Sequence, residues 1–221
     1  MITLFMINKS SLKLSKMELD VLDKLDTPEK IQKFIDEEIT YDPKRENRSI
    51  QEVIRDKRAE CYNGALLALA CLLTHNYKAS IVELLARDDE EHILCVYRVD
   101  GRYGSIAQSK FLGLKSRSPI YKSLHDLVIS YMEFYFAFDG RYSLLSHTNL
   151  IPLAKYKNKW LHDGKIVVQM AKDLRNSEHF NLIDLKDPFY HVSNERFWKE
   201  VLFIPNGVKI PKSYLPRPKK I

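Results

Sequence analysis

Cysteine is scarce in this chain of 221 residues, which has only three. Cys61 and Cys71 stand too far apart along one expected helix to bond to each other, so the sequence provides no disulfide framework. The absence of any Cys-x-x-Cys pair also argues against a structural zinc site. These absences favour a reducing compartment.

Long apolar runs are absent as well. No stretch approaches the roughly 18 uninterrupted apolar residues that suggest a membrane-spanning helix. The first residues lack a basic leader and a small-residue cleavage site. With 45% hydrophobic residues and no repeats, the composition predicts a soluble globular protein in the cytoplasm, without membrane contact.

Basic residues are in excess, but they do not gather in one place. The net charge is +6, and part of this excess lies in the last segment, between Lys209 and Lys220. A nucleic-acid interface concentrates its lysines and arginines on one face or along one helix. The charge therefore favours general solubility, and it gives no strong nucleic-acid signal.

The first half of the chain predicts three helices. Thr27 is the expected N-cap of a surface helix, and Ser49 and Glu52 have the capping-box spacing that opens a second, short helix. The run over residues 65–73 is too apolar to be anything but buried. A third helix therefore begins near Cys61, at the edge of a core.

Strands follow this helix. Residues 79–85 are rich in β-branched side chains, and residues 92–99 and 103–109 flank Asp100-Gly101. Asp-Gly between two such runs is the strongest short-range signal for a hairpin. With a two-residue turn, the numbers of cross-strand partners sum to about 201. His92 would then face Ser109.

The second half of the chain gives weaker signals. Residues 121–138 are rich in aromatics and predict one long helix, and further helices are expected over 164–174 and 193–201. Prolines from Pro205 onward favour an extended tail. No break in composition requires a second domain.

Cys61 is a candidate nucleophile. A thiol at a helix N-terminus lies among unpaired N–H groups and the positive end of the helix dipole, which favour the thiolate. The alternative is that Cys61 is one more small apolar residue at a helix start.

His92 is the histidine best placed to act as a base for this thiol. A buried helix followed by a strand, a loop and a second strand lets the sheet pack on the helix, which brings the start of the second strand to the helix N-terminus. The remaining histidines are expected at the surface; they are His75, His125, His147, His162, His179 and His191.

Three segments carry a family resemblance. Residues 49–68 around Cys61, residues 77–82, and residues 91–106 beginning at Glu91-His92 resemble the transglutaminase-like superfamily of papain-like cysteine enzymes. The family pattern has Gly-x-Cys at the start of a buried helix, a histidine opening a later strand, and an aspartate in the strand beyond. Residues 118–131 further resemble a small prokaryotic branch of that superfamily.

The resemblance implies an α+β fold with a papain-like core. In it the buried helix that carries Cys61 packs on an antiparallel sheet, and additional helices follow toward the C-terminus. We expect a single domain over residues 1–221, with a core at about 25–140, a C-terminal helical extension at about 141–205, and an extended tail at 206–221.

The sequence departs from the family pattern at two places. Ala59 stands where the family often has glycine, which is a mild change. The aspartate is missing, because the corresponding position falls among Ala107, Gln108 and Ser109. Gln108 could orient the histidine if a bulge turned it inward, and Ser109 could do so more weakly. The expected site is therefore Cys61, His92, Gln108 and Ser109.

Two functions from different classes remain open. One is a cysteine-dependent amide or ester hydrolase or acyltransferase, in which Cys61 attacks a carbonyl and His92 transfers the proton. The other is a catalytically impaired member of the fold that binds a peptide or protein. It is suggested by the missing aspartate and by an aromatic set that looks exposed in the sequence, namely Tyr62, Tyr97, Tyr103 and Tyr121.

A metal site is a weaker alternative. Its ligands would be Cys61, His75, His92 and Cys95, but His92 and Cys95 are three residues apart on a strand and point to opposite faces. No cofactor is implied, and the expected partner or substrate is a peptide or protein.

Overall fold

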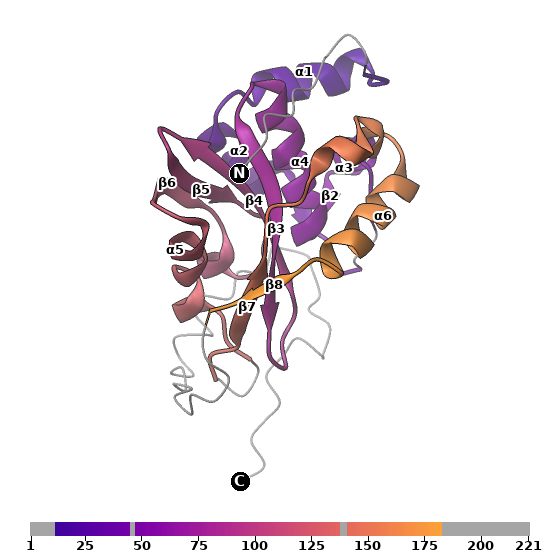
Figure 1. Ribbon diagram of the computed structural model, residues 1–221. Coiled ribbons are helices and arrows are strands. Elements are labelled where there is room, and N and C mark those ends of the chain that lie inside the picture. Colours follow the sequence, from indigo (N-terminus) through magenta and orange to yellow (C-terminus); the bar gives the residue numbers. More distant parts are fainter. Residues whose placement is uncertain (1–11, 45–46, 138–140, 183–221) are drawn as a thin grey trace.

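A sheet of antiparallel strands organises the computed structural model, which describes residues 12–44, 47–137 and 141–182 (Figure 1). Its six strands follow the order β6-β5-β4-β3-β7-β8. They are β3 (Lys78–Ala86), β4 (His92–Val99), β5 (Arg102–Ile106), β6 (Arg117–Tyr121), β7 (Leu144–Thr148) and β8 (His179–Asn181). The expected α+β fold with an antiparallel sheet is confirmed.

Helix α4 (Cys61–Thr74) forms the centre of the molecule. Every residue after Cys61 in this helix is buried, because its apolar side chains point in all directions. One side packs on β3 and β4, and the other contacts α1 (Lys16–Lys24), α2 (Pro28–Glu38) and α3 (Ile50–Asp56). The helix thus lies between the sheet and a layer of shorter helices (Figure 1).

Side-chain caps determine where the N-terminal helices begin. Thr27 accepts a hydrogen bond from the amide of Lys30, and Ser49 forms the predicted capping box with Glu52. An equivalent box joins Ser15 to Glu18 at the start of α1. Both of the predicted N-terminal helices are therefore confirmed.

The hairpin between β4 and β5 is confirmed, but it is shorter than expected. Asp100 and Gly101 have φ values of +47° and +77°, which a two-residue turn of the primed type requires. Val96 pairs with Ser105 as predicted, yet the ladder ends at the pair Cys95 and Ile106. Residues 107–109 have left the strand, so the ladder does not pair His92 with Ser109.

The prediction of one long aromatic helix over residues 121–138 is wrong. The chain instead completes β6 and then forms the short helix α5 (Leu124–Ile129) and a 3-10 turn at Met132–Phe134. Ser123 caps α5, and Tyr131 and Tyr135 turn into the core on the face of the sheet opposite α4. The aromatics are packed there, but they follow no single helical face.

The later part of the chain also completes the sheet. Helix α6 (Gly164–Arg175) matches the predicted helix over 164–174. The region expected to be a helical extension supplies β7, which pairs with β3, and β8, which pairs with β7. The helix expected over 193–201 and the tail lie outside the described residues. None of the helices in the described parts has the length and apolar character needed to cross a membrane.

A small parallel pairing brings the chain to the start of α4. Strands β1 (Thr40–Tyr41) and β2 (Arg58–Ala59) lie side by side, and the amide of Asp42 donates to the carbonyl of Ala59 at 2.9 Å. Cys61 follows β2 after one residue, so this pairing helps to fix its position.

Candidate functional site

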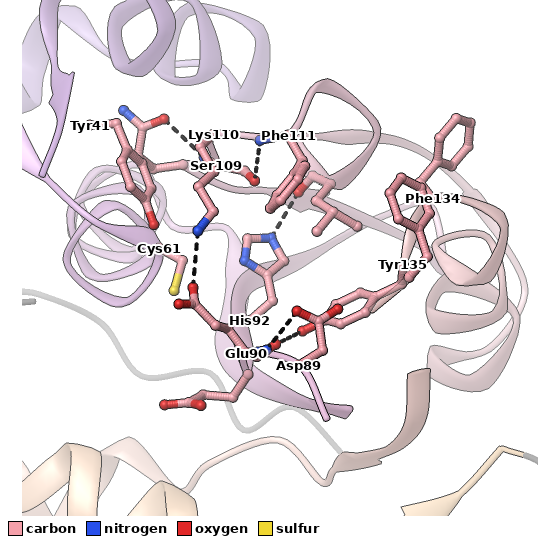
Figure 2. Close-up of a pocket in the computed structure, with 14 residues that line it drawn as sticks. Tyr41, Cys61, Asp89, Glu90, His92, Ser109, Lys110, Phe111, Phe134 and Tyr135 are labelled. Carbon is pink, nitrogen blue, oxygen red and sulfur yellow. Dashed lines mark hydrogen bonds and ion pairs between the residues drawn. The ribbon is translucent and has the colours of Figure 1, made fainter. Parts of the chain in front are cut away.

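One cavity is lined by all four site residues expected from the sequence. Cys61, His92, Gln108 and Ser109 contribute to its wall, together with aromatic and charged residues from three loops (Figure 2). Its volume is about 30 Å³, which admits a water molecule but leaves no room for an acyl group. The fold therefore brings the predicted residues together in one place.

The first turn of α4 differs electrostatically from the expectation. Glu60 is the N-cap, and its carboxylate accepts hydrogen bonds from the amides of Tyr62, at 2.7 Å, and Asn63, at 2.9 Å. The Cys61 thiol donates to the same carboxylate, with Sγ 3.2 Å from Glu60 Oε2. A negative charge at this distance disfavours the thiolate. Glu60 thus opposes the thiolate-favouring effect of the helix N-terminus.

Buried charges hold this turn in place. Asp42 is fully buried and lies 2.8 Å from a guanidinium nitrogen of Arg48 and 3.2 Å from one of Arg58. Burial alone would raise the pKa of Asp42, but hydrogen bonds from Arg58, the amide of Lys44 and Arg48 outweigh it and lower that pKa. The carbonyl of Arg48 in turn accepts a hydrogen bond from the Asn63 side chain at 3.0 Å.

His92 opens β4 and is held by the main chain. Its Nε2 lies 2.8 Å from the carbonyl oxygen of Leu114. Because a carbonyl can only accept, Nε2 carries the proton and Nδ1 is left as an acceptor. Figure 2 shows Nδ1 on the side of the ring toward Cys61. Burial lowers the pKa of His92 to about 4, so the ring is neutral near pH 7.

Gln108 and Ser109 line the cavity without orienting the histidine. The Gln108 amide donates to the carbonyl of Ile39 at 2.9 Å and accepts from the Ser109 amide at 2.9 Å, while Ser109 Oγ accepts from the Phe111 amide at 3.0 Å. These bonds stabilise the irregular segment that follows β5. The orienting role expected of Gln108 or Ser109 is thus taken by the Leu114 carbonyl.

Sequence reasoning missed the residues that cover the site. Lys110 Nζ lies 3.2 Å from Glu90 Oε2, and the Tyr135 hydroxyl donates to the Glu90 carbonyl. Asp89 accepts hydrogen bonds from the Glu90 amide, at 2.8 Å, and from Ser143, at 2.9 Å, and its burial raises its pKa to about 6. The available signal was the run of four acidic residues directly before His92.

Some residues expected at the surface are buried. His147 is 5% exposed, and its Nδ1 donates to the carbonyl of Thr148 at 2.8 Å. Tyr62 and Tyr97 are also buried, and the Tyr62 hydroxyl donates to the carbonyl of Val167. The aromatic set that suggested a peptide-binding surface therefore loses two of its members. Within the described ranges, no three His, Cys, Asp or Glu side chains are grouped so as to hold a metal ion.

The architecture resembles that of a known class of protein. A buried helix that begins at a cysteine and packs on an antiparallel sheet, with a histidine opening a neighbouring strand, is consistent with a transglutaminase-like core. Residues 10–112, a little under half of the chain, match the family model described as a transglutaminase-like domain, so this segment is similar to that family. The matched segment contains Cys61 and His92. No curated protein matches the chain.

Proposed function

We propose that the protein is a cysteine-dependent amide or ester hydrolase, or an acyltransferase, that uses Cys61 and His92. The observation that carries the proposal is the proton arrangement at His92. The bond from Nε2 to the Leu114 carbonyl leaves Nδ1 as the acceptor, on the side of the ring toward Cys61. A base fixed in the correct tautomer is what a thiol nucleophile requires.

The chemistry takes two stages. His92 Nδ1 accepts the thiol proton while Cys61 Sγ attacks the substrate carbonyl carbon, and the same proton then passes to the leaving amine or alcohol. In the second stage His92 takes a proton from water, or from an acceptor amine, which attacks the thioester carbon. The carbon–sulfur bond then breaks, and the proton passes from His92 to the Cys61 sulfur. The amide N–H of Cys61 is the expected donor to the oxyanion.

The resting pair is neutral in this mechanism. Burial lowers the pKa of His92 to about 4, and the Glu60 carboxylate disfavours the thiolate. Proton transfer therefore accompanies attack on the substrate instead of preceding it. We expect Cys61 to react more slowly with alkylating agents than a thiol in a preformed ion pair.

Alkylation and acylation of Cys61 test the proposal. Burial raises the pKa of both Cys71 and Cys95, so iodoacetamide should label Cys61 first. His92→Ala should slow this labelling by about tenfold or more, because the base is lost. The matched control is His147→Ala, which removes another buried histidine and should leave the rate unchanged.

Acylation gives the direct readout. A p-nitrophenyl ester should leave an acyl group on Cys61, detected by mass spectrometry, and Cys61→Ala should abolish it. Equal and slow labelling of all three thiols, or no acyl adduct on Cys61, would contradict an enzymatic role.

The second candidate function is peptide or protein binding without catalysis. The observation that favours it is the cavity of about 30 Å³, which is too small for an acyl group unless the Lys110–Glu90 pair opens. On this alternative, partners recovered by pull-down should bind Cys61→Ala as well as the unmodified protein, and no acyl adduct should form.

A further inference from the structure

A second cavity also reaches Cys61. Its volume is about 250 Å³, and its walls come from the start of α4, from β3 and β4, and from α6. Cys61 and Glu91 line both this cavity and the smaller one that contains His92. The sulfur therefore lies between a small space beside the base and a larger space that the chemistry described above does not use.

In the larger cavity the acidic side chains lie deeper than the basic ones. Glu60 and Glu83 are buried in its wall, and Glu91 is about one-third exposed. The basic residues Lys172 and Arg175 line it from α6 but are exposed to solvent, and Arg175 lies 3.4 Å from Glu91. The interior is thus acidic, whereas the basic side chains belong to the rim.

Glu83 is the residue that points to a ligand. It stands on the face of β3 that Ile81 uses to pack into the α4 core, where an apolar side chain is the ordinary choice. Its side chain is only 5% exposed, and Oε2 forms no hydrogen bond with the described residues. The basic side chain in contact with it is His179, whose Nε2 lies 3.4 Å from Oε2.

A buried carboxylate oxygen that meets an imidazole nitrogen at 3.4 Å, without the geometry of a hydrogen bond, is only partly compensated, whereas such groups normally have well-formed hydrogen bonds. Burial accordingly raises the pKa of Glu83, with His179 acting in the opposite direction. An occupant that brings N–H donors and a positive charge into the cavity would remove this cost. The apolar side chains of Ile93 and Leu174 line the same cavity and would contact a methylene chain.

We propose that this cavity takes a positively charged group of the substrate, an alkylammonium of the kind that a lysine side chain carries. Glu83 is its main partner, and Cys61 lies beside the cavity where the substrate carbonyl must reach. The space is sufficient, since a cavity of about 150 Å³ already holds benzene. This assignment rests on the proposed function in one respect, namely that the substrate carbonyl lies at Cys61.

Binding to the Cys61→Ala protein tests the cavity apart from the chemistry. The probes are Nα-acetyl-lysine amide, Nα-acetyl-norleucine amide, which has the same chain length without the ammonium, and Nα-acetyl-glutamate amide. Titrations monitored by NMR at mildly alkaline pH, which favours the ionised form of Glu83, give the affinities. We expect the lysine probe to bind about tenfold more tightly than the norleucine probe.

Two variants in the same background locate the interaction. Glu83→Gln should remove the preference for lysine, and because it replaces a buried charge by a neutral amide of the same size, the fold should persist. Arg102→Ala, at an exposed arginine of β5 that lines neither cavity, is the control and should keep the preference. Equal binding of the lysine and norleucine probes, or stronger binding of the glutamate probe, would overturn the assignment even without a variant.

The outcomes separate this inference from the proposed function. If Cys61 forms no acyl adduct but the lysine probe is preferred, the cavity assignment stands and the enzymatic role fails. If Cys61 is acylated but no preference for lysine exists, the cavity assignment fails alone. Retention of the preference in Glu83→Gln would also reject Glu83 as the partner.

Discussion

The cavity beside Cys61 has two walls of different construction. One wall consists of the first residues of α4 and β4, which place Cys61 and His92 on regular elements. The other is the irregular segment 107–114, in which the Gln108 and Ser109 side chains accept hydrogen bonds from nearby amides while the Leu114 carbonyl holds His92. In this site the reactive side chains come from the regular wall and the orienting group from the irregular one.

The largest expected effect is a loss of folding stability in acid, because His92 is buried in this site. Folding lowers the pKa of His92 from 6.5 to about 4, so the unfolded chain takes up a proton at higher pH than the folded one. The contribution of neutral His92 to the free energy of unfolding is therefore fully present above pH 6.5. It amounts to about 3 kcal/mol and is lost as the pH falls toward 4.

His92→Gln isolates this contribution. Glutamine can still donate to the Leu114 carbonyl but cannot titrate, so its free energy of unfolding should fall less between pH 7 and pH 4 than that of the unmodified protein. Urea denaturation at a series of pH values measures the difference, and His162→Gln, outside the cavity, is the control. Identical pH profiles for His92→Gln and the unmodified protein would mean that the ring is not held neutral by burial.

The contact between α4 and the irregular segment 107–114 gives the next largest expected effect, a loss of stability. A Cβ atom on Gly64 would lie 2.4 Å from Cβ of Gln108, so α4 and the irregular segment touch only because no side chain intervenes. Gly64→Ala should destabilise the protein by about 2 kcal/mol, because the overpacking outweighs the gain in helix propensity.

Thermal or urea denaturation measures this change. The control is Gly164→Ala at the start of α6, where the new Cβ would meet its nearest atoms at 3.8 Å and 4.0 Å, so stability should be nearly unchanged. Equal stability of the two alanine variants would show that the irregular wall can move away from α4 at little cost.

The two walls also differ in how far the sequence predicts them. The Cys61 helix, the strand beginning at His92 and the Asp100-Gly101 turn follow from apolar periodicity and turn chemistry, which are local properties. The segment after Ile106 does not, because leaving a strand depends on packing elsewhere. Gln108, for example, donates to the carbonyl of Ile39 in a distant part of the chain.

Main-chain roles leave no trace in the pattern of residue types. Any residue at position 114 could supply the carbonyl that holds His92, so the residue types in the sequence do not identify the orienting group. The misplaced helix over residues 121–138 has a related cause, since aromatics that serve a tertiary core can have helical spacing without forming a helix.

The smallest expected effect concerns the regular wall. Glu60→Gln removes the charge beside Cys61 and keeps an acceptor for only one of the amides of Tyr62 and Asn63, which the two carboxylate oxygens of Glu60 accept separately. Labelling of Cys61 by iodoacetamide near pH 7 should become several-fold faster, because the thiolate is less disfavoured. Stability should fall by about 1 kcal/mol, since a charged N-cap is lost.

The control for this variant is Glu52→Gln, which weakens the capping box of α3 away from the thiol. It should lower stability to a similar extent and leave the labelling rate unchanged. A slower or unchanged rate in Glu60→Gln would show that its carboxylate assists the thiol instead of restraining it.

The apolar surface on all sides of α4 has a consequence for folding during synthesis of the chain. During synthesis the preceding helices emerge first and can cover one side of it, but the strands that cover the other side are made later. Until β3 and β4 have left the ribosome, residues 61–74 present an apolar surface of the kind that chaperones bind and that drives aggregation. The helix that positions the thiol is thus also a segment that needs protection in the nascent chain.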